Sequence, residues 1–438
     1  MSMLEMGYLS FPVLLVLIFL RAPIGLAMML CGIGGLYLAM GGPTVFLAKL
    51  KTETYTTFSS YSLSIIPMFL LMGQFATLSG MSSALFKAAE SWLGHRRGGV
   101  AMAAVGACAG FGAICGSSLA TAATMSRVAL PELRRYGYSG GFSTATLAAG
   151  GTLGILIPPS VILVIYAILT EQNIAKLFLA AFIPGVLAAI GYMITISIYV
   201  RLYPDAAGTR EPQPYAERIR ALLDVWPVLI VFLVVVGGIY LGWFTPTEGA
   251  AVGAAGTGLI ALLSGNLNWK VFADSILSTA MSTAMIFFIV LGAGFYNSFL
   301  ALSQVPQELS SFVVSQGFSP WGVLMLILVF YLIFGCLMDS LSMILLTIPI
   351  FFPVISALDF GMTPEHLAIW FGILVLIVVE VGLITPPVGM NLFIINAMDR
   401  ETPMTSTYKS VLFFVGSDIV RVAILVMFPA ITLFLLPA

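Results

Sequence analysis

A few polar side chains interrupt long apolar stretches of this chain, and Asp339 is the most informative of them. It is the only charged residue between Glu308 and Asp359, and it lies inside the apolar stretch 319–357. At the centre of a bilayer a carboxylate costs about 3 kcal/mol on insertion scales unless it is paired or hydrated. Asp339 is therefore a candidate ligand for a cation or a solute, although it could also cap a helix by accepting backbone N–H bonds.

Ser117 and Ser118 interrupt a second apolar stretch, 99–131, in the same way. Their hydroxyls could bind a cation or a solute, or they could cap the helix that follows. Counting back 222 residues from Asp339 and Ser340 leads to these two serines, so the two polar interruptions hold matching places in the chain.

Two double prolines, Pro158-Pro159 and Pro386-Pro387, form a second pair of breaks. Proline lacks an N–H and clashes with the carbonyl four residues back, so two in succession leave several carbonyls free. We expect those carbonyls and nearby hydroxyls to coordinate a small cation such as Na⁺, while half-helix N-termini face an anionic substrate. The alternative is a purely structural kink, which is common in membrane helices. The flanking residues of interest are Ser160, Thr385, Gly389 and Asn391.

Further acidic residues fall inside apolar segments. Glu380 lies one turn before the second double proline, where it either faces a cavity or pairs with a polar group of a neighbouring helix. Asp418 and Arg421 are three residues apart, which predicts an ion pair on one helix face. Glu248 follows Thr245 by three residues, which predicts a capping box rather than a functional acid.

The composition indicates a lipid environment. Of the 438 residues, 60% are hydrophobic and 8% are charged, against roughly 25% charged in soluble domains. One soluble core cannot hide so many apolar side chains, so we predict an all-α integral membrane protein. The net charge of −1 gives no indication of nucleic-acid binding, and four cysteines and two histidines fit no disulfide framework or zinc site.

Apolar segments of about 20 residues predict about ten membrane-spanning helices. The expected spans are 3–20, 23–40, 62–92, 143–170, 175–200, 224–243, 247–264, 274–300, 366–398 and 410–436. The stretches 99–131 and 319–357 are each long enough for two short arms and are broken near the middle. We therefore predict two re-entrant helical hairpins, whose tips line a cavity or lie buried in protein.

Positive charges set the predicted orientation. Arginine pairs at 96–97 and 134–135 flank the first hairpin, so that hairpin should open to the cytoplasm. No Lys or Arg lies between residues 270 and 400, so the second hairpin should open to the outside, where we also expect both termini. Lys49 and Lys51 would then lie outside as well, which is a small departure from the rule.

The chain divides into two halves with the same order of elements. The predicted boundaries are 1–200 for a first repeat, 201–223 for a cytoplasmic connector and 224–438 for a second repeat. Within them we expect hairpins at 99–131 and 319–357 and broken helices at 143–170 and 366–398. Five spans and a hairpin per half are an odd number of crossings, so the halves would be inverted, as they are in secondary transporters.

Enzyme signatures are weak, and we predict that the chain is not an enzyme. Gly137-Tyr138-Ser139-Gly140 matches the GxSG of intramembrane serine proteases, but it falls in an expected cytoplasmic turn. The sequence holds no HExxH, Walker A or Rossmann glycine motif. Without a phosphate-binding loop, an ion gradient or a partner would have to drive transport.

The chain resembles the large membrane subunit of tripartite ATP-independent periplasmic (TRAP) transporters. The stretches that carry the resemblance are GFGAICGSSLATAATM, GGTLGILIPPSVILVIYA, GGIYLGWFTPTEGAAVG, GCLMDSLSMILLTIP and EVGLITPPVGMNLF. Their shared order covers nearly the whole length. The resemblance implies an elevator-type transporter of the bacterial inner membrane that imports a small organic acid with Na⁺. It also implies two partners, a periplasmic binding protein and a small membrane subunit of about four helices.

The resemblance further implies which residues bind. The implied cation ligands are Gly116, Ser117, Ser118, Pro158, Gly335, Asp339 and Thr385, to which we add Gly389 at the second break. The implied substrate contacts are Ser118, Ser160 and Asp339, to which we add Ser117 and Asn297.

One departure from the family bears on the substrate. Some members that take acidic sugars carry an arginine just ahead of the second hairpin, where this chain has Tyr296 and Asn297 in GFYNSFLALSQVPQEL. That argues against an acidic sugar and leaves C4-dicarboxylates and other small acids open. Two alternatives remain: a single-chain Na⁺-coupled anion transporter without a binding protein, and a membrane-embedded protease that uses Ser139.

Overall fold

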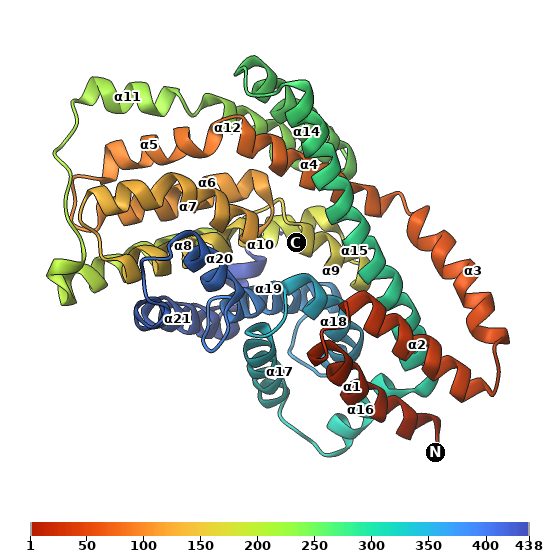
Figure 1. Ribbon diagram of the computed structural model, residues 1–438. Coiled ribbons are helices and arrows are strands. Elements are labelled where there is room, and N and C mark those ends of the chain that lie inside the picture. The colour runs from red at the N-terminus through yellow and green to blue at the C-terminus, as the bar shows by residue number, and fades with distance from the viewer. Residues whose placement is uncertain (1, 437–438) are drawn as a thin grey trace.

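The computed structural model describes residues 2–436, and within that range all regular secondary structure is helical (Figure 1). The helices before the connector are α1 (Met3–Phe19), α2 (Ile24–Met40), α3 (Thr44–Phe58), α4 (Ile65–Leu78), α5 (Met81–Leu93), α6 (Gly99–Cys115), α7 (Ser118–Arg135), α8 (Gly140–Leu156), α9 (Val161–Thr170) and α10 (Ile174–Leu202). Those that follow are α11 (Tyr215–Leu223), α12 (Trp226–Phe232), α13 (Gly238–Tyr240), α14 (Pro246–Leu263), α15 (Trp269–Ser303), α16 (Val305–Ser315), α17 (Pro320–Gly335), α18 (Ser340–Ser356), α19 (Pro364–Gly382), α20 (Met390–Met398), α21 (Met404–Met427) and α22 (Pro429–Leu433).

The helices differ from the predicted spans mainly in where they bend. The predicted span 62–92 is two helices, α4 and α5, separated at Gly80, whose φ is +80°. The predicted span 224–243 contains a π-helical turn at Leu233–Gly237, and the predicted span 274–300 is part of the 35-residue α15. Neither a glycine turn nor a π turn changes the local hydropathy, so composition alone could not place them.

The number of membrane crossings stays a prediction. Length and hydropathy identify four described helices that could span a bilayer, or up to seven if each of three bent helix pairs is one span. The predicted ten spans also counted shorter apolar helices such as α1 and α2, which have 17 residues each. A helix of that length is at the minimum of about 17 residues for a span.

Polar side chains fix where several helices start. Thr245 and Glu248 form the predicted capping box at the start of α14, which confirms the structural interpretation of that acid. Asn173, Asn268 and Thr363 cap α10, α15 and α19, and each accepts a backbone N–H from the third residue along. These caps satisfy donors that have no partner within the helix, so each start is set by sequence.

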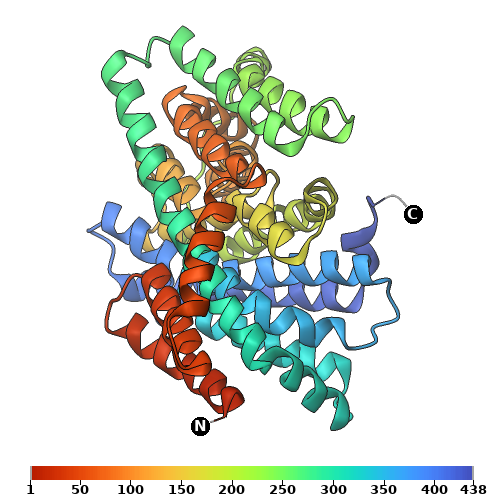
Figure 2. The ribbon, with the colours of Figure 1, turned by 90° about the vertical axis from the view of Figure 1, so that its right-hand side faces the viewer.

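The stretches predicted as hairpins are pairs of neighbouring helices joined by short turns. Helices α6 and α7 meet at Gly116-Ser117, and α7 continues to Arg135, beyond the expected end. Helices α17 and α18 are joined through residues 336–339. Figure 1 shows α6 and α7 packed with α5 and α8, whereas α17 lies at the lower edge of the molecule, and Figure 2 shows the same arrangement turned by 90°.

Glycines bring each hairpin into close contact with a broken helix. A Cβ on Gly112 of α6 would stand 2.5 Å from the Cα atom of Gly154 on α8. In the second half, a Cβ on Gly382 of α19 would stand 2.6 Å from the Cα atom of Gly335 on α17. Because real Cβ atoms do not come this close to backbone, both crossings require glycine, and each hairpin lies directly on its neighbour.

The second arm of each hairpin also packs against the other half of the chain. Helix α7 contacts α20, and α18 contacts α9. At the second of these crossings the Tyr166 ring lies edge-on to Phe352, with ring centroids 6.5 Å apart. The Tyr166 hydroxyl donates to the Ala368 carbonyl at 2.6 Å. The two halves are therefore interlocked rather than side by side.

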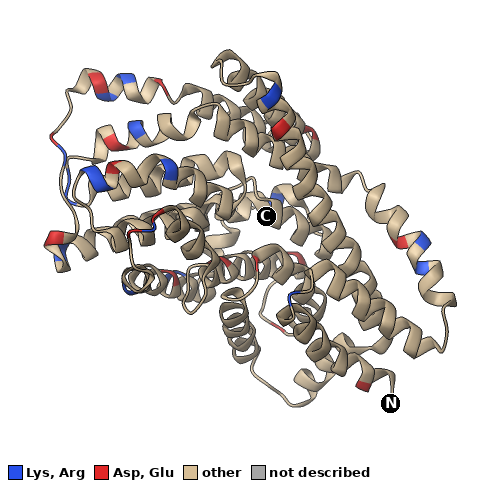
Figure 3. Ribbon diagram, viewed as in Figure 1, with Lys and Arg blue, Asp and Glu red and all other residues tan. Residues whose placement is uncertain are grey.

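Charged residues are unevenly placed over this frame. Figure 3 shows Lys and Arg gathered near α11 and the adjacent ends of α5, α6 and α7. Helices α17 and α18 carry neither Lys nor Arg. Any negative charge near the second hairpin therefore has no lysine or arginine within that hairpin to balance it.

Candidate functional site

The tip of the first hairpin lies against the first helix break. Gly116 ends α6 with φ +63°, a conformation that a side chain would strain. A Cβ there would stand 3.0 Å from the Pro159 carbonyl oxygen, so the tip backbone touches the break. Ser117 caps α7 by accepting the Ala120 N–H at 3.4 Å, and Ser118 is buried. The serine hydroxyls of the first tip and the carbonyls of the first helix break therefore lie next to each other.

The tip of the second hairpin lies against the second break. The Asp339 carboxylate caps α18 by accepting the Ser342 N–H at 3.0 Å and the Ser342 hydroxyl at 2.6 Å. The Gly389 N–H donates to the Cys336 carbonyl at 3.3 Å, which ties the start of α20 to the hairpin. The capping role expected for Asp339 is confirmed, and its carboxylate makes no ion pair with a described residue.

The other predicted ligands lie close to these tips along the broken helices. Ser160 is fully buried and caps α9 by accepting the Leu163 N–H at 3.4 Å, directly after the buried Pro158-Pro159 pair. The Thr385 hydroxyl donates to the Val381 carbonyl at 2.6 Å. The hydroxyl oxygens of Ser160 and Thr385 each keep at least one free lone pair, so both can still bind a cation.

Glu380 is a polar group that sequence reasoning left undecided. It lies on α19 and is fully buried. Ser340, the first residue of α18, donates its hydroxyl to Glu380 Oε1 at 2.6 Å. Ser118, the first residue of α7, lies within interaction range of the same carboxyl. Of the two interpretations from sequence, pairing with a polar group of a neighbouring helix is confirmed by the hydrogen bond from Ser340.

Asn391 connects the second break to the first half of the chain. It is fully buried on α20, and its Nδ2 donates to the Ala148 carbonyl of α8 at 3.4 Å. Its Oδ1 has no partner among the described residues. A buried hydrogen-bond acceptor is therefore left without a partner where α8 and α20 meet.

Asn297 lies outside both hairpins and both helix breaks. It is on α15, next to Tyr296, whose hydroxyl is 3.0 Å from the Ser10 hydroxyl of α1. No hydrogen bond between described residues joins Asn297 to either tip, and its Oδ1 has no partner there. Its role as a substrate contact stays a prediction.

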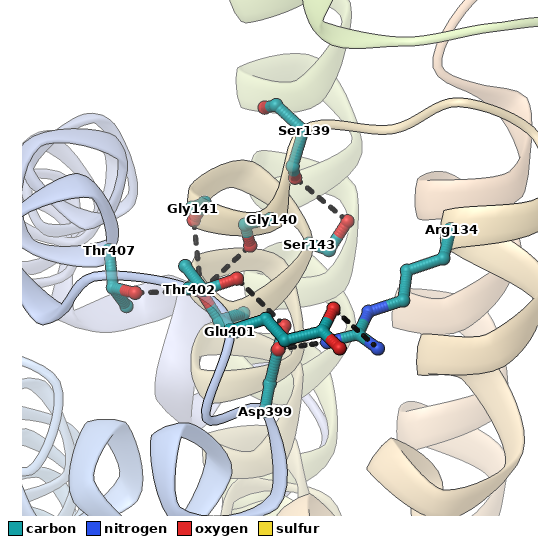
Figure 4. Close-up of polar contacts among 10 residues, drawn as sticks. Arg134, Ser139, Gly140, Gly141, Ser143, Asp399, Glu401, Thr402 and Thr407 are labelled. Atoms are coloured by element: carbon teal, nitrogen blue, oxygen red, sulfur yellow. Dashed lines mark hydrogen bonds and ion pairs between the residues drawn. The ribbon is translucent and has the colours of Figure 1, made fainter.

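A polar cluster joins the outer end of α7 to the segment after α20 (Figure 4). Arg134 pairs with Asp399, whose side chain is 1% exposed, and with Glu401 at 3.4 Å. The Thr402 hydroxyl donates to the second Asp399 oxygen at 2.9 Å. Sequence reasoning used Arg134 only to set orientation. The only feature of the sequence that pointed to this cluster was an acidic residue, Asp399, directly after an apolar helix. Its partner Arg134 is far away in sequence and could not be identified from it.

Two other expectations can be compared with the structure. The Asp418–Arg421 ion pair is confirmed at 2.8 Å, and the Tyr192 hydroxyl also donates to Asp418 at 2.8 Å. Ser139 is exposed at the start of α8, and its carbonyl accepts from the Ser143 hydroxyl at 3.0 Å. No hydrogen bond between described residues reaches the Ser139 hydroxyl.

The chemistry of the tips suits a hard monovalent cation better than a transition metal. Across residues 2–436 no group of three or more His, Cys, Asp or Glu side chains could hold a metal ion. What the tips offer instead is backbone carbonyls, hydroxyls and carboxylates. Oxygen ligands of this kind bind hard cations, and broken membrane helices use them for Na⁺.

Comparison with known proteins identifies a family that covers most of the chain. Residues 11–431 match the family model described as the tripartite ATP-independent periplasmic transporter, DctM component. The C4-dicarboxylate TRAP transporter large permease protein DctM of Pseudomonas aeruginosa is 37% identical over 387 residues, which are 88% of each chain. The sialic acid TRAP transporter large permease protein SiaM of Vibrio cholerae is 29% identical, over 96% of each chain.

A solved structure supports the fold. The YdaH transporter of Alcanivorax borkumensis, described as having an unusual topology, superposes with a TM-score of 0.64 at 14% identity. The match covers 89% of this chain and 90% of that one. The family match and the permease relatives, together with the apolar helices, indicate a multi-pass membrane protein.

Proposed function

Because the chain belongs to the DctM family of tripartite ATP-independent periplasmic transporters, we propose that it is a large permease subunit that imports a small organic acid together with Na⁺. The observation that carries this proposal is the pairing of each hairpin tip with a helix break. Gly116 lies on the Pro159 carbonyl in one pair, and Cys336 accepts from Gly389 in the other. Broken backbone at such a place is what secondary transporters use to bind ions and substrates.

Electrostatics support coupling to a cation. An organic acid that approaches the second tip meets Asp339, a carboxylate with no ion-pair partner among the described residues. Two like charges in a medium of low dielectric repel strongly. A bound Na⁺ near Asp339 would remove that repulsion, so substrate affinity would depend on Na⁺, and by reciprocity Na⁺ affinity would depend on substrate.

The proposed substrate class is a small acid such as a C4-dicarboxylate. The chain is 37% identical to a permease named for C4-dicarboxylates and 29% identical to one named for sialic acid. Residues 296 and 297 are Tyr and Asn, where some acidic-sugar transporters of the family carry an arginine. A site without that arginine would rely on helix N-termini, hydroxyls and bound Na⁺ to hold carboxylates.

The proposed movement is of the elevator type, with the hairpins and broken helices as the moving body. The glycine crossings at Gly112–Gly154 and Gly335–Gly382 support this, because they leave no room for one element to slide independently of the other. We place the chain in the bacterial inner membrane with both termini outside. Its proposed partners are a periplasmic binding protein and a small four-helix membrane subunit.

Uptake in proteoliposomes tests the proposal. The chain is reconstituted with the small subunit and the binding protein encoded beside it, and radiolabelled C4-dicarboxylates, sialic acid and other small acids are added with and without an inward Na⁺ gradient. We expect uptake of one acid that requires both Na⁺ and the binding protein. Equal uptake with K⁺ in place of Na⁺ would contradict Na⁺ coupling, and uptake by this chain alone would favour a single-chain transporter.

A further inference from the structure

Only one of the two oxygens of the buried Glu380 carboxylate has a hydrogen-bond partner among the described residues. The side chain is fully buried, and Oε1 accepts the Ser340 hydroxyl at 2.6 Å. The other oxygen, Oε2, is buried as well and has no partner among the described residues. An unpaired oxygen on a buried carboxylate is costly, because the protein supplies nothing in place of the water it lost.

No positively charged side chain compensates this carboxylate. None of the ion pairs between described residues includes Glu380. The chain has no Lys or Arg from residue 271 to residue 399, a range that contains α17, α18, α19 and α20. Asp339 precedes Ser340 directly and is also without an ion-pair partner, so two acidic residues share this region and no base does.

The groups around Glu380 come from both hairpins. Ser340 starts α18 at the second tip, and Ser118 starts α7 at the first tip within interaction range of the carboxyl. Both serines are buried, at 4% and 1% exposure. A hydroxyl has one donor and two acceptor lone pairs, so a serine that donates to a carboxylate can still bind a cation through its oxygen.

We propose that Glu380 is a ligand of a coupling cation held between the two hairpin tips, with the hydroxyls of Ser118 and Ser340 as further oxygen ligands. The donor set is one carboxylate and neutral oxygens, which suits a monovalent hard cation of the Na⁺ class. The described residues offer no third acidic or imidazole group to make a site for a divalent transition metal. This inference rests on the proposed Na⁺ coupling and adds to it a site that joins the two halves of the chain.

Such a site would make cation binding sensitive to both hairpins at once. Glu380 on α19 is fixed by the glycine crossing of Gly382 with Gly335. A cation that bridges it to Ser118 and Ser340 would hold the tips of α7 and α18 together. Without the cation, only the second tip would stay attached to α19, through the hydrogen bond from Ser340 to Glu380.

The test is Na⁺ binding by the purified full chain in nanodiscs, measured by the Na⁺ dependence of its unfolding temperature and by ²²Na⁺ binding, with K⁺ keeping ionic strength constant. Glu380→Gln keeps the size of the side chain and removes its charge. We expect the half-saturating Na⁺ concentration to rise at least about tenfold. Glu308→Gln, on the exposed first turn of α16, is the matched control and should leave that concentration unchanged.

Ser340→Ala keeps the test decisive if Glu380→Gln does not fold. It removes one oxygen from the proposed site while leaving the carboxylate, and we expect the half-saturating Na⁺ concentration to rise about threefold. Wild-type Na⁺ affinity in both variants, or in Ser340→Ala alone where only that variant folds, would overturn the inference.

The uptake assay separates this failure from failure of the proposed function. Na⁺-driven uptake by the wild type, with Glu380→Gln keeping the wild-type Na⁺ affinity, would overturn the Glu380 site and leave Na⁺ coupling intact. Absence of Na⁺ dependence in both uptake and binding by the wild type would overturn both. Raised half-saturating Na⁺ in both assays for Glu380→Gln, with the control unchanged, would support the site.

Discussion

The two hairpin tips have the same backbone plan and different charge. Each second arm starts with a residue that caps it from the side chain: Ser117 accepts the Ala120 N–H at 3.4 Å, and Asp339 accepts the Ser342 N–H at 3.0 Å. Each tip lies on a helix broken by a double proline. The first tip, however, offers only hydroxyls and carbonyls, whereas the second offers a carboxylate.

The difference extends to the outer ends of the hairpins. The end of α7 is held to the segment after α20 by the Arg134–Asp399 ion pair. The corresponding crossing of α18 with α9 is made by rings, with Phe352 edge-on to Tyr166. The first hairpin thus has a neutral tip and an ion pair at its outer end. The second hairpin has a charged tip and an aromatic contact at its outer end. We infer that cation binding depends mainly on the second tip, and mechanical anchoring on the outer end of the first.

Labelling with an impermeant thiol reagent tests whether the two hairpins open to opposite faces, and it should give an all-or-none difference. Ser356→Cys, at the end of α18, should react from the outside of right-side-out vesicles, and Ser139→Cys, at the start of α8, should not. Both positions are exposed and all four native cysteines are buried, so background labelling should be low. The reverse pattern would invert the predicted orientation.

Asp339→Asn tests whether charge at the second tip matters beyond the cap. Asparagine caps a helix about as well as aspartate, so α18 should still start at the same residue. We expect Na⁺-dependent uptake in proteoliposomes to fall at least about tenfold, equivalent to about 1.4 kcal/mol. Asp359→Asn, whose carboxylate accepts only the Gly361 N–H in an exposed turn, is the control. Full uptake by Asp339→Asn would show that the charge of Asp339 is not what makes the second tip different in function from the first.

Arg134→Gln tests the ionic anchor of the first hairpin. It leaves Asp399 buried without its partner, and removing one partner of a fully buried pair costs about 3–5 kcal/mol. Arg134 is 43% exposed, so we expect a smaller loss of about 1–2 kcal/mol in unfolding free energy in detergent. Arg135→Gln breaks a surface pair with Glu132 and a cation–π contact with Tyr136, and it should cost less than about 1 kcal/mol. Equal losses in the two variants would contradict the anchor.

Ser117→Ala should have the smallest effect. The cap that it removes is a long hydrogen bond at 3.4 Å, so the loss of stability should be about 0.5 kcal/mol, at the low end for such caps. We expect the half-saturating Na⁺ concentration in the uptake assay to rise less than about threefold. A loss as large as that of Asp339→Asn would mean that the two tips contribute equally to cation binding, whatever their charge.

The positions of the two tips and the two helix breaks could be predicted because their residues are conspicuous in an apolar chain. Asp339, the paired serines and the double prolines each break a run of side chains that lipid or a core would accept, so their positions can be read without a structure. Local pairs were equally accessible, since the Thr245–Glu248 box and the Asp418–Arg421 pair depend on a spacing of three residues.

Long-range partners could not be predicted in the same way. Ser340 reaches Glu380 across 40 residues, and Arg134 reaches Asp399 across 265. The first contact depends on how α18 and α19 cross within the second half, and the other depends on how helices of the two halves meet. Hydropathy encodes neither. The bend at Gly80 and the π turn at Leu233–Gly237 were missed for a related reason. They are local changes of backbone path within segments whose side chains remain apolar.

The absence of Lys and Arg between residues 270 and 400 has a consequence for membrane voltage. Under the proposed movement, Asp339 and Glu380 travel with the second hairpin and its broken helix, and no Lys or Arg in those elements balances their charge. Moving one elementary charge fully across a potential of 100 mV changes its free energy by about 2.3 kcal/mol. In a cell that is negative inside, an unloaded carrier would be driven outward, ready for the next substrate. Bound cations would cancel that force and let the loaded carrier move inward.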